Sequence, residues 1–373
     1  MTIQRNAISV GIIGCGHVTT NWHLPALRHV ADVEVVALAD IDHELMTLVG
    51  DRFHVRRLHR DYRELLSDST IEAVAIFVPA QLHTEVALAA LDAGKHVLIE
   101  KPLALSLDEC DVLIEAAQKT SLIAMVGFNL RWHRHIRKAL EVIRIGKLGH
   151  IKMIRSVFTC ATEHADTGFS WKTRREAGGG TLIEMAVHHY DLWRLLLGSE
   201  VEEVFSMSRS DVSDDETAAV AARMDSGALA SLALSEETGG DTELEIFGQN
   251  GRLRISLTRY DGLRFFPRSR EAGDIHTHIN GIRHGLRELS RVIRRFPQTS
   301  DWAGAFCAEW MHFIEAVRGR EEVGCTLVEG RQAVEIALAA TESASTGVPV
   351  RVSAAPRTIT PVSTQRSRES NEH

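Results

Sequence analysis

The strongest constraint on the fold is an alternation of short apolar runs with helix-like segments over the first 127 residues. The apolar runs are residues 7–13, 33–39, 73–78, 96–99 and 123–126, and the helix-like segments between them are 24–30, 44–53, 62–67, 83–93 and 107–119. Strands that are apolar throughout are buried on both faces, as in a parallel sheet covered by helices. The pattern predicts an α/β fold with a doubly wound parallel sheet over residues 1–127.

The pattern changes after residue 127. The later segments are a helix over 133–145, a strand over 151–159, a helix over 181–197, strands over 201–208, 217–224, 228–234, 243–248 and 252–257, helices over 302–318 and 329–345, and a strand over 348–352. Turn sequences such as Gln249-Asn-Gly251 join successive strands, which is typical of an antiparallel sheet. We expect a second, α+β domain over residues 128–353, and a disordered tail over 354–373, which is rich in Ser, Thr, Arg and Pro.

Composition excludes several classes of protein. A net charge of -8 disfavours a nucleic-acid backbone as partner, because neutralising phosphates needs a basic surface. The five cysteines are scattered and form no C-x-x-C pair, so we expect neither a disulfide framework nor a zinc site, and a reducing compartment. The chain has no apolar run long enough to span a membrane and no signal-peptide pattern. These features predict a cytoplasmic protein without a membrane partner.

A glycine-rich loop, Gly14-Cys-Gly16-His-Val-Thr19, separates the first predicted strand from the first helix. Gly14 permits a tight turn, and Gly16 lets a pyrophosphate approach the backbone at the start of a helix. Thr19 stands where the third glycine of G-x-G-x-x-G is expected, and a bare G-x-G also occurs in ordinary turns. The strand before the loop and the helix after it favour a dinucleotide-binding loop.

Asp40 ends the second predicted strand, about two dozen residues beyond the glycine loop. A carboxylate at this place accepts both hydroxyls of a ribose and repels a 2′-phosphate. No Arg or Lys lies beside it in Ala39-Asp-Ile-Asp42, so we expect NAD rather than NADP. The alternative is that Asp40 only caps a turn.

Lys101 lies at the end of another predicted strand, in Glu100-Lys101-Pro102. Open α/β sheets bind ligands beyond the carboxyl ends of their strands, where a lysine can stabilise a developing alkoxide. Pro102 restricts Lys101 to an extended conformation. The alternative is a surface lysine before a helix-starting proline.

A second candidate cluster follows the triple glycine 178–180. Glu184, His188 and Asp191 are spaced i, i+4 and i+7, which puts them on one helix face. Histidine exchanges a proton near neutral pH, and an acidic neighbour can orient it. The same spacing fits a Glu–His metal site or an ordinary helix surface, but the sequence names no further metal ligand, so we expect no metal.

Several longer segments carry a family resemblance. They are Val78-Pro-Ala-Gln-Leu-His83, Ala93-Gly-Lys-His-Val-Leu-Ile-Glu-Lys-Pro102, Gly127-Phe-Asn-Leu-Arg131, Gly146-Lys-Leu-Gly149, Gly178-Gly-Gly180 and Ser345-Thr-Gly-Val-Pro-Val350. Together they resemble the Gfo/Idh/MocA family of oxidoreductases, from about Val10 to about Val352. The resemblance implies a Rossmann domain, an open and mostly antiparallel second sheet that often forms oligomer contacts, and sugar-like or cyclitol substrates. It implies a homo-oligomer, either a dimer or a tetramer.

The resemblance also implies roles for single residues. Lys101 and His188 would be catalytic, with Glu184 beside them. The expected cofactor contacts are Gly14, Cys15, Gly16, His17, Val18, Asp40, Val78, Pro79, His83, Glu100, Lys101 and Asn129, and the expected substrate contacts are Arg131, His164, Trp171 and Asp191. The family pattern D-x-G-x-H reads Glu184-Met-Ala186-Val-His188 here, which moves the carboxylate outward by roughly 1.5 Å.

These features predict an NAD-dependent dehydrogenase that transfers hydride at a CH–OH carbon of a sugar, a cyclitol or a sugar derivative. Two alternatives stay open. One is an NAD-dependent glycosidase with no net redox change, and the other is a cofactor-binding regulator without catalysis. Retention of both Lys101 and His188 argues against the regulator.

Overall fold

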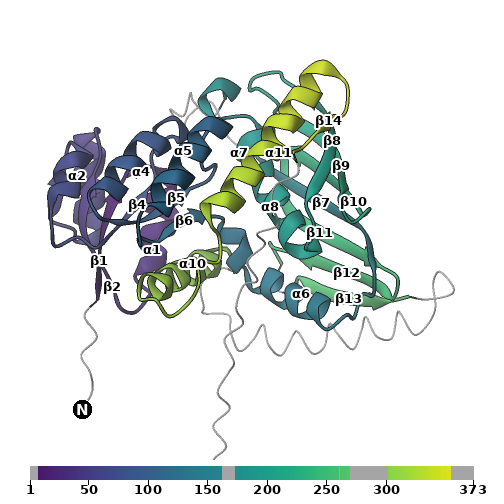
Figure 1. Cartoon of the computed structure of the whole chain (residues 1–373), viewed down its shortest axis with the longest axis horizontal. Coiled ribbons are helices and arrows are strands. Elements are labelled where there is room, and N and C mark those ends of the chain that lie inside the picture. Colours follow the sequence, from purple (N-terminus) through teal and green to yellow (C-terminus); the bar gives the residue numbers. More distant parts are fainter. Residues whose placement is uncertain (1–6, 162–172, 260, 269–300, 354–373) are drawn as a thin grey trace, which may run out of the picture.

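The computed structural model describes residues 7–161, 173–259, 261–268 and 301–353. Figure 1 shows two sheets, each with its own helices, joined side by side. The predicted tail and two expected substrate contacts, His164 and Trp171, lie outside the described residues.

The first sheet contains six parallel strands in the order β3-β2-β1-β4-β5-β6. The strands are β1 (Ile8–Ile13), β2 (Val33–Ala39), β3 (Arg57–His59), β4 (Ala73–Ile76), β5 (His96–Glu100) and β6 (Ala124–Gly127). The prediction of a doubly wound parallel sheet is confirmed. The sequence did not predict β3, because this edge strand is short and carries Arg and His in place of an apolar run. The strand order reverses between β1 and β4, where such sheets bind their ligands.

Helices α1 to α5 of the first part lie where the sequence predicts helices, and the short helical turns η1 and η2 were not predicted. They are η1 (Thr19–His23), α1 (Leu24–Leu27), α2 (His43–Phe53), α3 (Tyr62–Ser67), η2 (Ala80–Leu82), α4 (His83–Asp92) and α5 (Leu107–Gln118). Local signals set their ends. The Asp42 carboxylate accepts a hydrogen bond from the amide of Leu45 at the start of α2, and Ser106 with Glu109 forms a capping box on α5.

The second sheet contains eight strands in the order β13-β12-β11-β7-β10-β9-β8-β14. They are β7 (Ile151–Ala161), β8 (Val201–Arg209), β9 (Thr217–Met224), β10 (Leu229–Ser235), β11 (Glu237–Gly248), β12 (Gly251–Ser256), β13 (Leu263–Pro267) and β14 (Val350–Arg351). All neighbours are antiparallel except β7 and β10. The mostly antiparallel sheet is therefore confirmed, and β13 is an addition that the sequence did not predict.

The remaining helices follow β6 in the chain, and α11 among them contacts elements of both parts, including α5 and β8. They are η3 (Asn129–Trp132), α6 (Arg134–Arg144), η4 (Arg175–Ala177), α7 (Thr181–Glu184), α8 (Ala186–Leu197), α10 (Asp301–Val317) and α11 (Leu327–Thr346). The single helix predicted over 181–197 is divided into α7 and α8 at Met185. None of the helices in the described part is long and apolar enough to cross a membrane.

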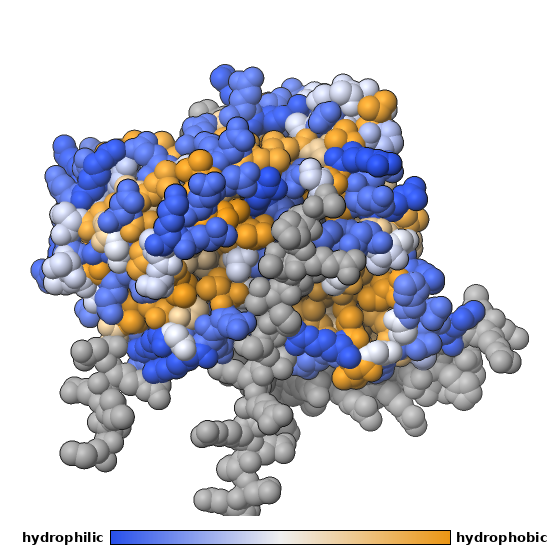
Figure 2. Space-filling view, in the orientation of Figure 1, coloured by the Kyte–Doolittle hydropathy of each residue, from blue (hydrophilic) through white to orange (hydrophobic). Residues whose placement is uncertain are grey.

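Helix α10 comes late in the chain but packs against the first sheet. Phe306, Trp310 and Phe313 belong to the same apolar core as strands β1, β4 and β5. The strands of the first sheet end at Gly127 and those of the second begin at Ile151, whereas the first core also takes side chains from α10 and from the start of α11. Figure 2 shows hydrophilic side chains over much of the outer surface, interrupted by apolar areas on both parts.

His189 is a buried titratable residue of the second part of the chain. Its side chain on α8 is fully buried, and neither ring nitrogen has a hydrogen-bond partner among the described residues. Burial lowers the pKa of His189 from 6.5 to about 3. The folded protein therefore keeps this ring neutral at pH values where the unfolded chain protonates it.

Replacing His189 by Leu (H189L) should reduce the loss of stability in mild acid. Below about pH 6.5 the unfolded state binds one more proton than the folded state, so the free energy of unfolding falls as the pH falls. For one such histidine the decline between pH 7 and pH 5 is about 2 kcal/mol. Urea denaturation at both pH values measures it, and H150L, which changes an exposed histidine, serves as the matched control. An equal decline in the wild type and H189L would contradict the prediction.

Candidate active site

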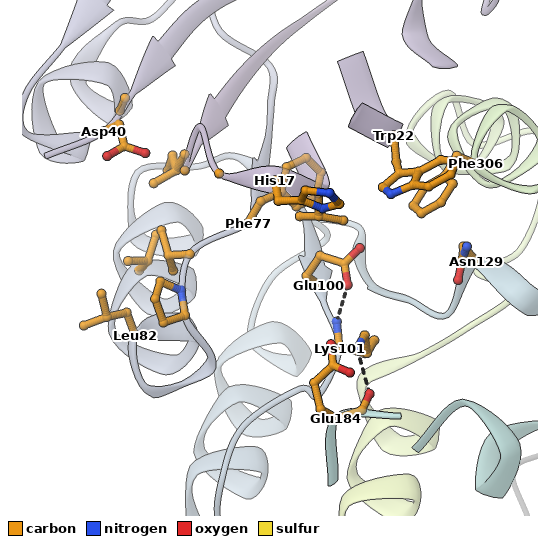
Figure 3. A pocket seen from close by; sticks show the side chains of 18 of the residues that line it. His17, Trp22, Asp40, Phe77, Leu82, Glu100, Lys101, Asn129, Glu184 and Phe306 are labelled. Carbon is orange, nitrogen blue, oxygen red and sulfur yellow. Dashed lines mark hydrogen bonds and ion pairs between the residues drawn. The ribbon is translucent and has the colours of Figure 1, made fainter. Parts of the chain in front are cut away.

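A cavity of about 890 Å³ lies at the carboxyl ends of the first sheet, where the two parts of the chain meet. Its wall includes the ends of β1, β2, β4 and β5, together with residues of β7, α7, α8 and α10. Of the expected cofactor contacts, it is lined by Gly14, Gly16, His17, Val18, Asp40, Val78, Pro79, Glu100, Lys101 and Asn129. Figure 3 shows Asp40 at one end of this pocket and Trp22, Phe306 and Asn129 at the other.

The glycine loop has the geometry that the sequence predicts. Gly14 has φ +100°, and a Cβ there would lie 2.5 Å from the carbonyl oxygen of Phe77, so only glycine fits. A Cβ on Gly16 would meet nothing within 4 Å, so the backbone is open to an approaching phosphate. The hydroxyl of Thr19, which replaces the third glycine, donates to the Gly14 carbonyl at 2.7 Å. Thr19 therefore stabilises the loop from inside.

The Asp40 carboxylate is held by two backbone amides. Its oxygens accept hydrogen bonds from Cys15 N–H at 2.6 Å and from Asp42 N–H at 2.9 Å. The carboxylate is thereby oriented at the mouth of the pocket. Arg60 also lines the pocket, because it follows β3 and β3 pairs with β2 beside Asp40. The sequence could not reveal this cation, since it depends on an unpredicted edge strand.

Two of the expected cofactor contacts lie behind the wall of the pocket. Cys15 is fully buried, and its contribution is the amide that binds Asp40. The ring of His83 is buried within hydrogen-bond distance of two carbonyl oxygens, 2.8 Å from Pro102 and 2.9 Å from Val78. His83 therefore ties the loop after β4 to the turn after β5.

Lys101 and Glu184 form an ion pair inside the pocket. The Lys101 ammonium donates to the Glu184 carboxylate at 2.8 Å and to the Glu184 carbonyl oxygen at 2.8 Å (Figure 3). The sequence placed Glu184 on one helix face with His188. The helix is divided at Met185 into α7 and α8, and Glu184, at the end of α7, forms its ion pair with Lys101 from the end of β5.

Glu100 anchors the strand end that carries Lys101. One carboxylate oxygen accepts the Lys101 backbone N–H at 3.0 Å, and the other lies 2.9 Å from His23 Nε2. The indole N–H of Trp310 donates to His23 Nδ1 at 3.0 Å, so the proton of the neutral ring is on Nε2 and is donated to Glu100. The sequence did not reveal His23 or Trp310, because no local pattern links residues so far apart.

His188 lines the same pocket and is 8% exposed. Its Nδ1 has no hydrogen-bond partner among the described residues. Burial holds the pKa of His188 well below 6.5, and the charge of Lys101 lowers it further, with Glu184 acting in the opposite direction. His188 is therefore a neutral imidazole with an acceptor nitrogen available.

The structure does not bring Arg131 or Asp191 to the pocket, in contrast to their expected substrate contacts. Arg131 donates to the two Asp191 oxygens at 2.7 and 2.5 Å, to Glu329 at 2.8 Å and to the carbonyl of Gly324 at 2.7 Å. The three charged side chains are almost fully buried. Their hydrogen bonds and ion pairs hold η3, α8 and α11 together.

The sequence also missed the aromatic side of the pocket. Trp22, Trp302, Phe306 and Phe158 line it. Aromatic residues in helices and strands look like core residues in a sequence, and only the packing shows which of them face a cavity.

Among the described residues, no group of three or more His, Cys, Asp or Glu side chains could hold a metal ion.

Comparison with known proteins agrees with this geometry. The family model described as an oxidoreductase family with an NAD-binding Rossmann fold matches residues 8–128, and the model of its C-terminal alpha/beta domain matches residues 141–352.

Individual relatives are similar over nearly the whole chain. Myo-inositol 2-dehydrogenase of Thermotoga maritima is 28% identical over 343 residues, covering 90% of this chain and 95% of that protein. The scyllo-inositol 2-dehydrogenase (NAD(+)) of Bacillus subtilis is 25% identical over 358 residues, covering 94% and 97%. The crystal structure of scyllo-inositol dehydrogenase from Lactobacillus casei with NAD(H) and scyllo-inositol shares the fold, with a TM-score of 0.75, 23% identity and coverage of 93% and 99%.

Both halves of the chain thus match one family, and the loop after β1 has the glycine geometry of a dinucleotide site. The chain belongs to the Gfo/Idh/MocA oxidoreductase family and carries its NAD-binding Rossmann domain.

Proposed function

We propose that this protein is an NAD-dependent dehydrogenase that acts on a CH–OH carbon of a sugar or cyclitol. The observation that carries the proposal is that Lys101 and His188 share one pocket with the glycine loop and Asp40. Relatives named as inositol dehydrogenases support a substrate with several hydroxyl groups.

The pocket residues fit NAD by their own geometry. Gly14 and Gly16 leave room for the pyrophosphate, and the helix that follows them presents backbone amides to it. The Asp40 carboxylate, which two backbone amides hold in place, would accept the hydroxyls of the adenosine ribose. When bound, NAD supplies the hydride acceptor.

His188 and Lys101 have different roles at the substrate hydroxyl. His188 is neutral, so its imidazole can accept the hydroxyl proton. The Lys101 ammonium has three N–H groups, of which two bind Glu184, and the third stabilises the negative charge that develops on the substrate oxygen. Glu184 acts as a positioning residue that fixes the ammonium.

The open face of the second sheet supports a homo-oligomer. Met153, Met207 and Leu229 are exposed on this face, whereas their neighbours Ile154, Ser206 and Ala230 are buried on the other. Exposed apolar side chains on one surface favour contact with another chain. We propose that the protein forms a homo-oligomer through this face and acts in the cytoplasm.

Replacing Lys101 by Met (K101M) should lower kcat by about 100-fold or more, because the oxyanion loses its cation. The Kd of NADH should stay within a few-fold, since the glycine loop and Asp40 are unchanged. Turnover is measured on a panel of sugars and cyclitols from the absorbance of the NADH formed. Net formation of NADH also distinguishes a dehydrogenase from a glycosidase, which has no net redox change. K119M, which changes an exposed lysine, is the matched control. Near-normal turnover by K101M would rule out the assigned role.

Replacing Asp40 by Ala (D40A) should raise the Kd of NADH about tenfold, since two charge-assisted hydrogen bonds to the ribose are lost. The same change removes the repulsion of a 2′-phosphate and leaves Arg60 beside it, so NADPH binding should improve. Calorimetric titration with both cofactors measures the ratio of their Kd values. In D40A/R60A the gain for NADPH should disappear. An unchanged ratio in D40A would show that Asp40 does not select the cofactor.

A further inference from the structure

One end of the pocket has an aromatic wall, formed by Trp22, Trp302 and Phe306. The rings of Trp22 and Phe306 are stacked, with centroids 5.8 Å apart and an interplanar angle of 14°. Trp302 meets Trp22 edge to face at 6.3 Å. Figure 3 shows Trp22 and Phe306 side by side, away from Asp40 and therefore away from the expected adenosine end.

The backbone that presents Trp22 is unusual. Residues Thr19–His23 form a π-helical turn directly after the glycine loop, in which Leu24 N–H bonds to the carbonyl oxygen of Thr19. Such widened turns are rare and concentrate at functional sites. Here the turn places Trp22 on the pocket wall, while the next residue, His23, points inward to Glu100. Two elements distant in sequence, η1 and α10, thus combine to build the wall.

Polar groups line the pocket as well. Lys101, Glu184 and His188 provide charge and a proton acceptor. The side-chain amide nitrogen of Asn129 is buried and has no hydrogen-bond partner among the described residues, although Asn129 lines the pocket. A buried donor without a partner is costly, so a ligand that accepts its hydrogen bond gains affinity.

A ligand that satisfies both sides must be polar at its edge and apolar on its face. A closed ring bearing hydroxyl groups has this form, because its hydroxyls project from the rim and its C–H bonds gather on the faces. An open-chain polyol with the same hydroxyl groups presents no such face. Trp indoles provide a large, flat apolar surface for contact at little conformational cost.

We propose that Trp22, Trp302 and Phe306 bind the C–H face of a cyclic substrate, so that the enzyme selects closed rings over open-chain polyols. The inference rests on the proposed function and assigns a residue for specificity, Trp22, to the same site. If the aromatic wall binds the substrate, its loss weakens the binding of the ring. If the wall stacked on the cofactor, its loss would weaken the binding of NADH.

The test is calorimetric titration of the NADH complex with two matched pairs of probes. One pair is myo-inositol and D-mannitol, and the other is D-glucose and D-sorbitol, so that each ring is compared with an open chain of similar hydroxyl content. In the wild type, at least one ring should bind more tightly than its open-chain counterpart. Trp22→Ala should weaken the binding of that ring about tenfold and leave the open chain almost unchanged. Trp22→Phe, which keeps an aromatic face, should restore most of the loss.

The control is Ile41→Ala, which trims an apolar side chain beside Asp40 at the other end of the pocket and should leave the ratio of ring to open chain unchanged. The inference is overturned if neither ring is preferred in the wild type, or if W22A weakens ring and open chain equally. It is also overturned if W22A weakens NADH binding and leaves the ring unaffected. Hydride transfer by the wild type is measured separately. The absence of hydride transfer with every probe would count against the proposed function. The affinities for the cyclic probes would still test the role of the aromatic wall.

Discussion

The ion pair between Lys101 and Glu184 is the interaction on which the site depends. It joins the carboxyl end of β5 to the end of α7, so a residue of the Rossmann sheet meets a residue of the second domain inside the pocket. Both side chains are mostly shielded from solvent, with 13% and 21% of their surfaces exposed, so the cost of desolvation offsets part of their attraction. Its value lies in geometry, because it fixes an ammonium that would otherwise sample many rotamers.

That geometry is supported from behind by buried polar groups. Trp310 donates to His23, His23 donates to Glu100, and Glu100 accepts the backbone amide of Lys101. Each bond runs in one direction because indole is only a donor and carboxylate only an acceptor. Helix α10, which is late in the chain, therefore contributes to the position of a strand end near its beginning. Arg131 likewise joins distant elements, because its hydrogen bonds to Asp191 and Glu329 connect η3 to α8 and α11.

In the pocket, a neutral His188 lies near the charged ammonium of Lys101. The Lys101 charge and burial both favour the neutral form of His188, and Glu184 moderates the effect. A fixed cation next to a neutral base is a suitable pair for removing a proton while negative charge develops nearby. The departure from the family pattern at Glu184 keeps a carboxylate in the site, and in this structure that carboxylate binds the lysine.

The sequence alone determined the features that depend on local geometry. Gly14 must be glycine because of its φ of +100°, and Asp42 and Ser106 begin helices through their own side chains. Five of the six strands of the first sheet were predictable, because burial on both faces demands continuous apolar runs, and only the short edge strand β3 was not. Lys101 and Asp40 were identified because strand ends in such a sheet face the ligand.

Tertiary structure decided which side chains meet. Lys101 and Glu184 are 83 positions apart, Arg131 and Asp191 are 60 apart, and His23 and Trp310 are 287 apart. Spacing along one helix predicted a shared face for Glu184, His188 and Asp191. The structure keeps Glu184 and His188 in one pocket, whereas Asp191 binds Arg131 outside it. The aromatic wall belongs to this second kind of feature. Whether Trp22 faces a core or a cavity depends on how η1 and α10 pack, and no local pattern of residues contains that information.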